Sequence, residues 1–181
     1  MVVKRKLTVA DFLLMGESGL FTPDERLELL DGDIYTVSPP SPQHAGIVKR
    51  IAKLLEQAYG DRCLVSVQDP LVLSDHRLTE PDIALLKPNA SFYTDRHPQA
   101  KDALLVIEVS RTSLNFDKTE KLPRYAESGI AEVWIVDVDA NVLEVHREPF
   151  GRVYRQRVLF YPSETVQPLV FAETAGIVVL A

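Results

Sequence analysis

The chain has 181 residues, of which 46% are hydrophobic and 25% charged, as expected for a soluble globular protein with its own core. A formal net charge of −6 argues against a globally basic nucleic-acid-binding surface, so any phosphate contact must be local or metal-bridged. The single cysteine excludes an intrachain disulfide and a thiolate zinc cluster, and without an apolar export signal or a membrane-length segment we expect a cytoplasmic protein.

The N-terminal third of the sequence is patterned mainly as helix. Residues 8–15 predict a short helix, because a threonine can cap its first turn and an aspartate three residues later completes a capping box. A second helix is predicted over residues 22–30, with Pro23 at its first helical position, followed by an Asp-Gly turn and a strand. A third helix is predicted over residues 41–60, where apolar residues recur at helical spacing and a glycine suits the end.

From residue 63 the apolar pattern changes to that of strands. Two β-rich runs, over residues 63–73 and 81–86, are separated by a polar segment. Residues 87–102 have no clear periodicity and contain two prolines, so we expect a long mobile loop. The run "ALLVIEVS" over residues 103–110 is continuous enough to predict a central strand that is covered on both faces.

A helix is predicted after this strand, over about residues 115–128, with Gly129 suited to end it. Segments 132–139, 142–149 and 152–161 predict three more strands. The strand–helix–strand unit favours a right-handed parallel crossover, whereas the neighbouring hairpins require antiparallel pairs. We therefore expect an α/β fold with a mixed central β-sheet flanked by helices, in one domain that spans the whole chain.

Two carboxylates interrupt the apolar strands. Asp82 follows a proline at the head of "PDIALL", and Glu108 lies late in "LLVIEVS". If these strands are neighbours, the two carboxylates converge at one end of the sheet, where they repel each other unless a cation joins them. Oxygen ligands of this kind suit Mg²⁺ or Mn²⁺ rather than Zn²⁺.

Further polar residues fall close to this pair in the predicted fold. Ser110 projects beside Glu108, because alternate residues of a strand share a face. Asp117 and Lys121 are four residues apart on the next helix, and Tyr125 lies one turn later. The helix that follows the central strand therefore carries an acid, a lysine and a tyrosine on one face.

Four blocks of the sequence carry a resemblance to a known family. In chain order, "RLELLDGDIYTVSPPSPQHAGIV", "EPDIALL", "LLVIEVS" and "DKTEKLPRYAESGIAEVWIVD" resemble the Uma2 family of restriction endonucleases, which belongs to the PD-(D/E)XK nuclease superfamily. The resemblance extends from Arg26 to Arg147. It implies a restriction-endonuclease-like fold and an endonuclease that hydrolyses phosphodiester bonds in DNA with Mg²⁺ or Mn²⁺.

The resemblance also implies catalytic roles. Asp82 matches the aspartate of the PD motif and Glu108 the acidic residue of the second motif, so both would ligate the metal, with the backbone carbonyl of Val109 as a further candidate ligand. The superfamily pattern has a lysine two residues after the second acid, where this sequence has Ser110. Lys121 is the expected substitute, and it would orient the attacking water or stabilise the charged phosphate.

Two auxiliary residues match positions in the N-terminal block of the family. Glu28 would be a further metal ligand through water, and His44 would contact a phosphate or relay a proton. Cutting two strands makes a homodimer the expected assembly, and no membrane partner is expected.

Each of these residues also has a purely structural interpretation. Asp82 could mark an ordinary loop-to-strand entry, and Glu108 could pair with a lysine or lie at an exposed strand end. Asp117 and Lys121 could form a solvated ion pair that contributes only about 0.2–0.5 kcal/mol. Other side chains would be core or solvated surface on this interpretation: Glu28, His44, Tyr125, Trp134, Arg147, Arg152, Arg155 and Arg157. The alternative function is a catalytically decayed nuclease-fold module that acts as an oligomeric nucleic-acid- or protein-binding protein.

Overall fold

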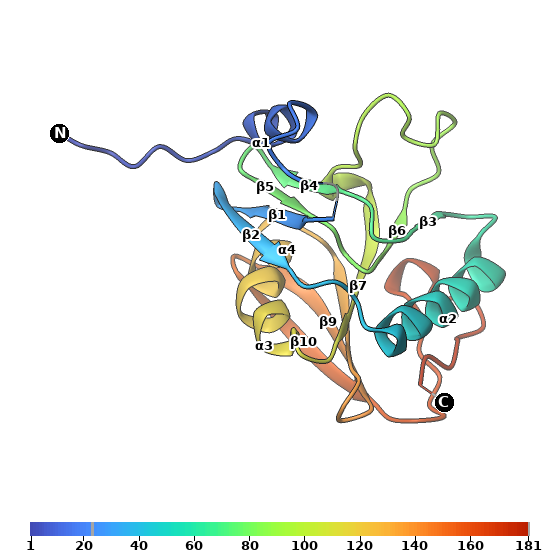
Figure 1. Cartoon of the computed structure of the whole chain (residues 1–181). Helices are drawn as coiled ribbons and strands as arrows, with labels where there is room; N and C mark the ends of the chain where they lie inside the picture. The colour runs from blue at the N-terminus through green and yellow to red at the C-terminus, as the bar shows by residue number, and fades with distance from the viewer. Residues whose placement is uncertain (23, 181) are drawn as a thin grey trace.

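The computed structural model describes residues 1–22 and 24–180, in which helices flank two β-sheets (Figure 1). The first half contains α1 Val9–Glu17, β1 Arg26–Leu30, β2 Asp33–Val37, α2 Pro42–Tyr59, β3 Leu64–Ser66, β4 Leu71–Ser74, β5 Arg77–Thr79 and β6 Ile83–Leu86. The second half contains a 3-10 helix Ala100–Asp102, β7 Ala103–Ser110, α3 Leu114–Phe116, a π-helix Asp117–Lys121, α4 Leu122–Glu127, β8 Glu132–Asp137, β9 Val142–Phe150, β10 Val153–Phe160 and a 3-10 helix Leu169–Phe171. The predicted α/β class is confirmed.

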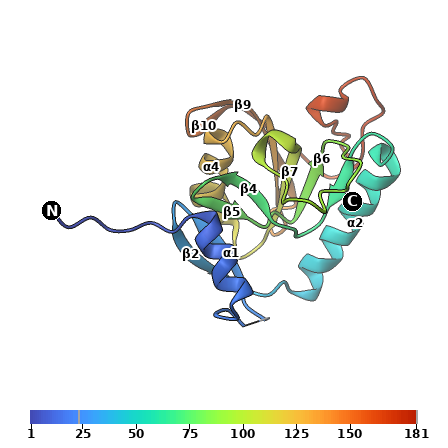
Figure 2. The ribbon, with the colours of Figure 1, turned by 90° about the horizontal axis from the view of Figure 1, so that it is seen from above.

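The larger sheet has six strands in the order β10-β9-β8-β7-β6-β3. Strands β7 and β8 are parallel neighbours, and the other pairs are antiparallel, so the sheet is mixed as predicted. Strand β7 is buried along nearly its whole length because both faces of the sheet are covered. On one face, the large sheet packs against α2 and the C-terminal segment to form one hydrophobic core cluster. On the other face, it packs against α4 and β4 to form a second cluster. Figure 2 shows α2 at one side of the molecule and α1 with β4 and β5 at another.

The smaller sheet has four strands in the order β2-β1-β5-β4 and corrects two predictions. Residues 26–30, predicted to continue a helix, form β1, and the polar segment after β4 contains β5. Asp31 and Gly32 both have positive φ angles of 52° and 77°, which is the geometry of a tight hairpin turn. This turn pairs β1 with β2. Because successive side chains of a strand point to opposite faces, Leu27 and Leu29 are buried on one face of β1 and Glu28 lies on the other.

The N-terminal helix α1 is confirmed, together with the capping box between Thr8 and Asp11. The predicted start signal of the second helix included Pro23, which lies outside the described residues. The backbone N–H and hydroxyl of Thr22 donate to the carboxylate of Glu25, as at a helix start, but the chain enters β1 at the next residue. Local capping chemistry is therefore overridden by hairpin pairing.

Helix α2 follows the prediction closely. The Ser41 side chain accepts a hydrogen bond from the backbone N–H of His44, and Gly60 caps the C-terminal end. The residues that bury one side of α2 against the six-stranded sheet are Val48, Ile51, Leu55 and Tyr59. This packing fixes the start of the helix, and with it His44, beside the end of β7.

The helix predicted over residues 115–128 is present as three consecutive segments, α3, the π-helix and α4. The sequence did not predict the π-helical turn, which carries the buried residues Asp117 and Lys121. Gly129 ends the helix with a φ angle of 76°, as predicted. Residues 87–99 form the expected long loop between β6 and the 3-10 helix that leads into β7.

Candidate active site

A cavity of about 310 Å³ opens between the two sheets and the start of α2. Five of the six predicted site residues line it, namely Glu28, His44, Asp82, Glu108 and Lys121. They come from β1, α2, the residue before β6, β7 and the π-helix. Residues far apart in the sequence are thus brought together at one end of the large sheet.

Glu108 and Lys121 form the centre of this site. Lys121 Nζ lies 2.9 Å from Glu108 Oε1, and the Tyr125 hydroxyl donates to the same oxygen at 2.6 Å. Glu108 is only 3% exposed and Lys121 5%, so both charges are removed from water. The lysine on the following helix does reach back to the second motif, and the interpretation of Lys121 as a solvated surface residue is wrong.

Glu28 joins the same lysine from the smaller sheet. Its Oε1 lies 3.0 Å from Lys121 Nζ and accepts the backbone N–H of Glu80 at 2.9 Å. Its Oε2 is buried and has no hydrogen-bond partner within the described part of the chain. One buried ammonium is therefore shared by two buried carboxylates, one from each sheet.

Asp82 lies across from Glu108, because β6 and β7 are antiparallel and pair Ile83 with Ile107. Its Oδ2 accepts the backbone N–H of Val109 at 2.9 Å, and the Asp82 backbone N–H points at Glu108 Oε2 at 3.5 Å. The two carboxylates are therefore neighbours, as the sequence predicted. This proximity places both of them at the end of the sheet where the cavity opens.

His44 and Gln68 complete the surroundings of Asp82. His44 Nε2 lies 3.0 Å from Asp82 Oδ2, and the side-chain amide of Gln68 donates to Oδ1 at 3.1 Å. Gln68 has a φ angle of 55°, which is uncommon for a residue other than glycine, and its backbone N–H also donates to the Asp82 carbonyl. Sequence reasoning missed Gln68, because nothing in "VSVQDPL" marks a left-handed backbone that turns toward the site.

The pKa values of Glu108 and Lys121 reflect their burial. Desolvation raises the pKa of Glu108 to about 8, with Asp82 and Glu28 adding to the effect and Lys121 opposing it. Burial alone would lower the pKa of Lys121, but the charges of Glu108 and Glu28 outweigh it and raise that pKa. The site thus holds a firmly charged lysine and a carboxyl group that lacks sufficient positive charge around it.

The pair Asp82 and His44 behaves differently. The hydrogen bond that His44 donates to Asp82 raises the pKa of His44. Burial alone would raise the pKa of Asp82, but its contacts with His44, Val109 and Gln68 lower it below the usual value. Asp82 is therefore an ionised carboxylate at neutral pH, and His44 accepts a proton more readily than an isolated histidine.

The donor set suits a hard divalent cation. Glu108 Oε2 has only the long contact to the Asp82 N–H, Glu28 Oε2 has no partner among the described residues, and Asp82 is ionised, so three oxygen donors border one cavity. Within residues 1–22 and 24–180, no group of three or more His, Cys, Asp or Glu side chains is close enough to hold a metal alone. Water and a backbone carbonyl would have to fill other positions, which is how Mg²⁺ usually binds.

Ser110, at the position of the motif lysine, does not line the cavity. Its hydroxyl donates to Asp117 Oδ2 at 2.7 Å, and the Ser113 hydroxyl donates to the same oxygen at 2.7 Å. These contacts anchor the start of the π-helix to the end of β7. Asp117 borders the cavity, and its Oδ2 accepts both serine hydroxyls, so the two serines position the segment that carries Lys121.

The arginines of the last strands are mostly held in ion pairs. Arg147 Nη2 lies 2.7 Å from Glu132, Arg152 Nη1 3.4 Å from Glu127, and Arg157 Nη2 2.8 Å from Glu144. Their arrangement agrees with the structural interpretation of this cluster. None of these arginines borders the cavity.

Comparison with known proteins connects this geometry to a family. A family model described as "Uma2: Putative restriction endonuclease" matches residues 9–179. A solved structure described as a putative nuclease belonging to DUF820 from Anabaena variabilis has a TM-score of 0.72 and 17% sequence identity, covering 96% of this chain and 95% of its own. No curated protein matches the sequence significantly. In the part of the chain that the structure describes, every helix is too short or too polar to cross a membrane.

Proposed function

The chain belongs to the Uma2 family, and from this membership and the geometry of the cavity we propose that it is a nuclease that hydrolyses phosphodiester bonds in DNA with the help of Mg²⁺ or Mn²⁺. The single observation that carries the proposal is the shared ion pair of Lys121 with Glu28 and Glu108, directly beside an ionised Asp82. Buried carboxylates with unused oxygens, together with a charged lysine, are suited to phosphoryl chemistry.

In the proposed site, Asp82 and Glu108 hold the metal, with the carbonyl of Val109 and water as further ligands. When bound, the divalent ion supplies a water molecule of lowered pKa and offsets the negative charge that develops on the phosphate. Burial raises the pKa of Glu108 to about 8, so Glu108 would have to release a proton in order to hold the ion. The affinity for metal should therefore rise with pH across the neutral range.

Lys121 is proposed to stabilise the transition state. Its ammonium is held by two carboxylates and has three N–H bonds, so it can keep its contacts to Glu28 and Glu108 and direct the third toward a phosphate oxygen or the attacking water. The Tyr125 hydroxyl donates a hydrogen bond to Glu108 and fixes the orientation of its carboxylate. Preorganised charge of this kind typically contributes about 10²–10³ to the rate.

His44 is proposed as an auxiliary residue of the same site. Its Nε2 contacts Asp82, and its Nδ1 is buried without a hydrogen-bond partner within the described residues. The raised pKa favours the protonated ring, which can donate a proton to a phosphate oxygen. A cytoplasmic homodimer with two such cavities would act on the two strands of a duplex.

The proposal is tested by nicking of supercoiled plasmid DNA in Mg²⁺ or Mn²⁺. Glu108→Gln and Lys121→Ala should each abolish most of the activity, because one removes a metal ligand and the other removes the cation. The matched controls are Glu144→Gln, which changes another buried carboxylate, and Lys118→Ala, which changes a lysine of the same π-helix outside the cavity. Both controls should retain activity.

A second function, binding without catalysis, is favoured by one observation. Ser110 stands where the family pattern implies a lysine, and Lys121 is already neutralised by carboxylates in the metal-free protein. Equal nicking by wild type and both site variants, or no nicking by any protein, would favour this function over the nuclease.

A further inference from the structure

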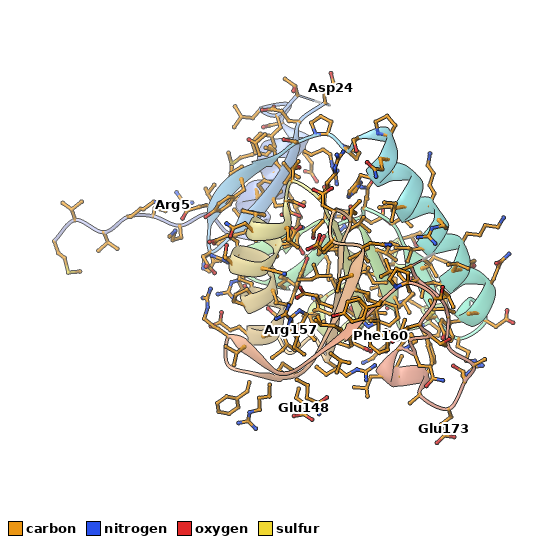
Figure 3. All side chains as sticks on the ribbon, turned by 90° about the horizontal axis from the view of Figure 1, so that it is seen from below. Arg5, Asp24, Glu148, Arg157, Phe160 and Glu173 are labelled. Carbon is orange, nitrogen blue, oxygen red and sulfur yellow. The ribbon has the colours of Figure 1, made fainter. Side chains whose placement is uncertain are left out.

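Helix α2 carries positive charge on its outer side. Lys49, Arg50 and Lys53 are exposed and fall within about 100° of arc on the helix. This arc lies opposite the stripe that α2 buries against the six-stranded sheet. Figure 3 shows long side chains that project from the outer side of α2 away from the rest of the molecule. Glu56 is the one acidic residue of the helix, and it lies beyond Lys53 toward the C-terminal end.

These charges differ from most others because they have no partners. In a protein of net charge −6, most basic side chains are held in ion pairs. Among the described residues, the basic side chains outside the ion pairs are Lys49, Arg50, Lys53, Arg62, Lys87, Lys101 and Arg155. Helix α2 and the residues directly after it hold four of these seven, so unneutralised positive charge is concentrated there.

Gly46 is a second and independent feature of the same arc. A glycine inside a helix is unfavourable compared with alanine, so it needs a reason. Packing does not supply one, since a Cβ atom added at Gly46 would meet no atom within 4 Å. Its backbone is therefore open to close approach from outside, about one turn before Lys49 and Arg50.

The first turn of α2 lies between the arc and the active-site cavity. Ser41 and His44 at the start of α2 line that cavity, and the helix then extends away from it. From Gly46 to Lys53 the helix rises about 10 Å, which equals the rise of about three nucleotides of one strand measured along the duplex axis, at about 3.4 Å each. His44 lies on the side of α2 that carries the buried stripe, opposite the arc, so a strand that lies on the arc reaches the cavity by crossing over the first turn of the helix.

We propose that Gly46, Lys49, Arg50 and Lys53 form a docking track on which the phosphate backbone of DNA lies, leading one strand over the first turn of α2 into the cavity. The inference rests on the proposed nuclease function, and it names the surface that brings the substrate to that site. Contacts to phosphates do not depend on base sequence, so the track gives affinity without sequence specificity.

The first test measures binding of a fluorescent DNA duplex at several salt concentrations, without divalent metal so that no cleavage occurs. A triple variant, Lys49→Gln with Arg50→Gln and Lys53→Gln, is compared with a control triple, Lys87→Gln with Lys101→Gln and Arg155→Gln. Both remove three exposed, unpaired positive charges. The track variant should lose roughly tenfold in affinity at low salt. The slope of log affinity against log salt concentration should also become shallower by about 2–3, since each phosphate contact contributes about 0.9 to that slope. The control triple should bind like wild type.

The second test uses Gly46→Ala and Gly46→Leu. Alanine should raise the melting temperature, because the helix gains propensity and nothing obstructs the new methyl group. If DNA lies against this glycine, alanine should nevertheless weaken DNA binding, and leucine should weaken it further. A structural role alone cannot produce a more stable protein that binds less well.

Equal losses in the two triple variants would overturn the track, because they would show an effect of net charge only. Unchanged binding in the track variant, or no DNA binding by wild type, would overturn it as well. A parallel plasmid-nicking assay separates the two proposals. Cleavage by wild type with unaltered binding in the track variant rejects the track alone, whereas track-dependent binding without cleavage rejects the nuclease alone.

Discussion

The π-helix carries two lysines into two buried carboxylate clusters, and the clusters differ in how fully they are neutralised. Glu144 on β9 is contacted by Lys118 at 2.6 Å, by Arg157 at 2.8 Å and by His146 at 3.2 Å. Burial alone would raise the pKa of Glu144, but the two cations Lys118 and Arg157 outweigh it and hold that pKa below its usual value. This cluster has the properties of a structural ion pair.

The cluster at the cavity has the opposite balance. Lys121 is shared by Glu28 and Glu108, Asp82 lies alongside, and burial raises the pKa of Glu108 to about 8. Two buried carboxylates with one lysine leave oxygens unused and charge uncompensated, so the site has a place for a cation that the Glu144 cluster lacks. Burial of a charge alone does not identify a functional site, but insufficient neutralisation inside a cavity does.

The largest expected effect is the difference in stability loss between the two lysine-to-alanine variants. Lys121→Ala leaves two buried carboxylates without a cation and should lower the free energy of unfolding at about pH 8 by about 3–5 kcal/mol. Lys118→Ala should cost about 1 kcal/mol or less, since Arg157 and His146 remain on Glu144 and the lysine is partly exposed. Urea unfolding of both variants measures the difference. Similar losses for both would remove the distinction between the clusters.

The pH dependence of stability should differ in sign between the clusters. Between about pH 4.5 and about pH 8 the folded protein keeps a proton on Glu108 that the unfolded chain has released, so stability falls as pH rises. Glu144 has the opposite effect on stability, because its pKa is lower in the folded protein than in the unfolded chain. The stability that it contributes is present above about pH 4.5 and is lost as the pH falls through its pKa in the folded protein.

The measurement is the free energy of unfolding in urea without metal, at several values from about pH 5 to about pH 8. Glu108→Gln should flatten the decline, because glutamine cannot take up the proton. Glu144→Gln should keep the wild-type slope in this range, since its own effect lies at lower pH. A decline that persists unchanged in Glu108→Gln would show that another group binds the proton.

A smaller effect is expected from the hydrogen bond that Gln68 donates to Asp82. Gln68→Ala removes one donor at 3.1 Å and should cost about 1 kcal/mol of stability, and it should weaken Mn²⁺ binding about tenfold because Asp82 loses its fixed orientation. Arg157→Gln, which removes a donor from Glu144, is the matched control and should leave Mn²⁺ affinity unaltered. Mn²⁺ affinity that is equal in Gln68→Ala and wild type would exclude Gln68 from positioning Asp82.

The sequence predicted the parts of this site that depend on strand order. Asp82 and Glu108 interrupt apolar strands, and their convergence follows once β6 and β7 are neighbours. The reach of Lys121 follows from the helix after β7. These residues stand out because a charge in an apolar segment needs a partner.

Other features could not be read from local pattern. Residues 26–30 have a helical start signal, yet hairpin pairing through the Asp31-Gly32 turn makes them β1, which is how Glu28 enters the cavity. The left-handed backbone at Gln68 and the π-helical turn before Lys121 arise from tertiary contacts. Ion-pair partners of the arginines on the last strands are likewise set by neighbours distant in sequence.

The most direct test of the nuclease site is a titration of Mn²⁺ into a plasmid-cleavage assay with wild type, Glu108→Gln and Glu144→Gln. If Glu108 holds the metal, cleavage should rise to saturation with Mn²⁺ for wild type and Glu144→Gln, and should fall about 10²-fold or more for Glu108→Gln. Cleavage by Glu108→Gln at the wild-type rate, or no Mn²⁺-dependent cleavage by wild type, would contradict it.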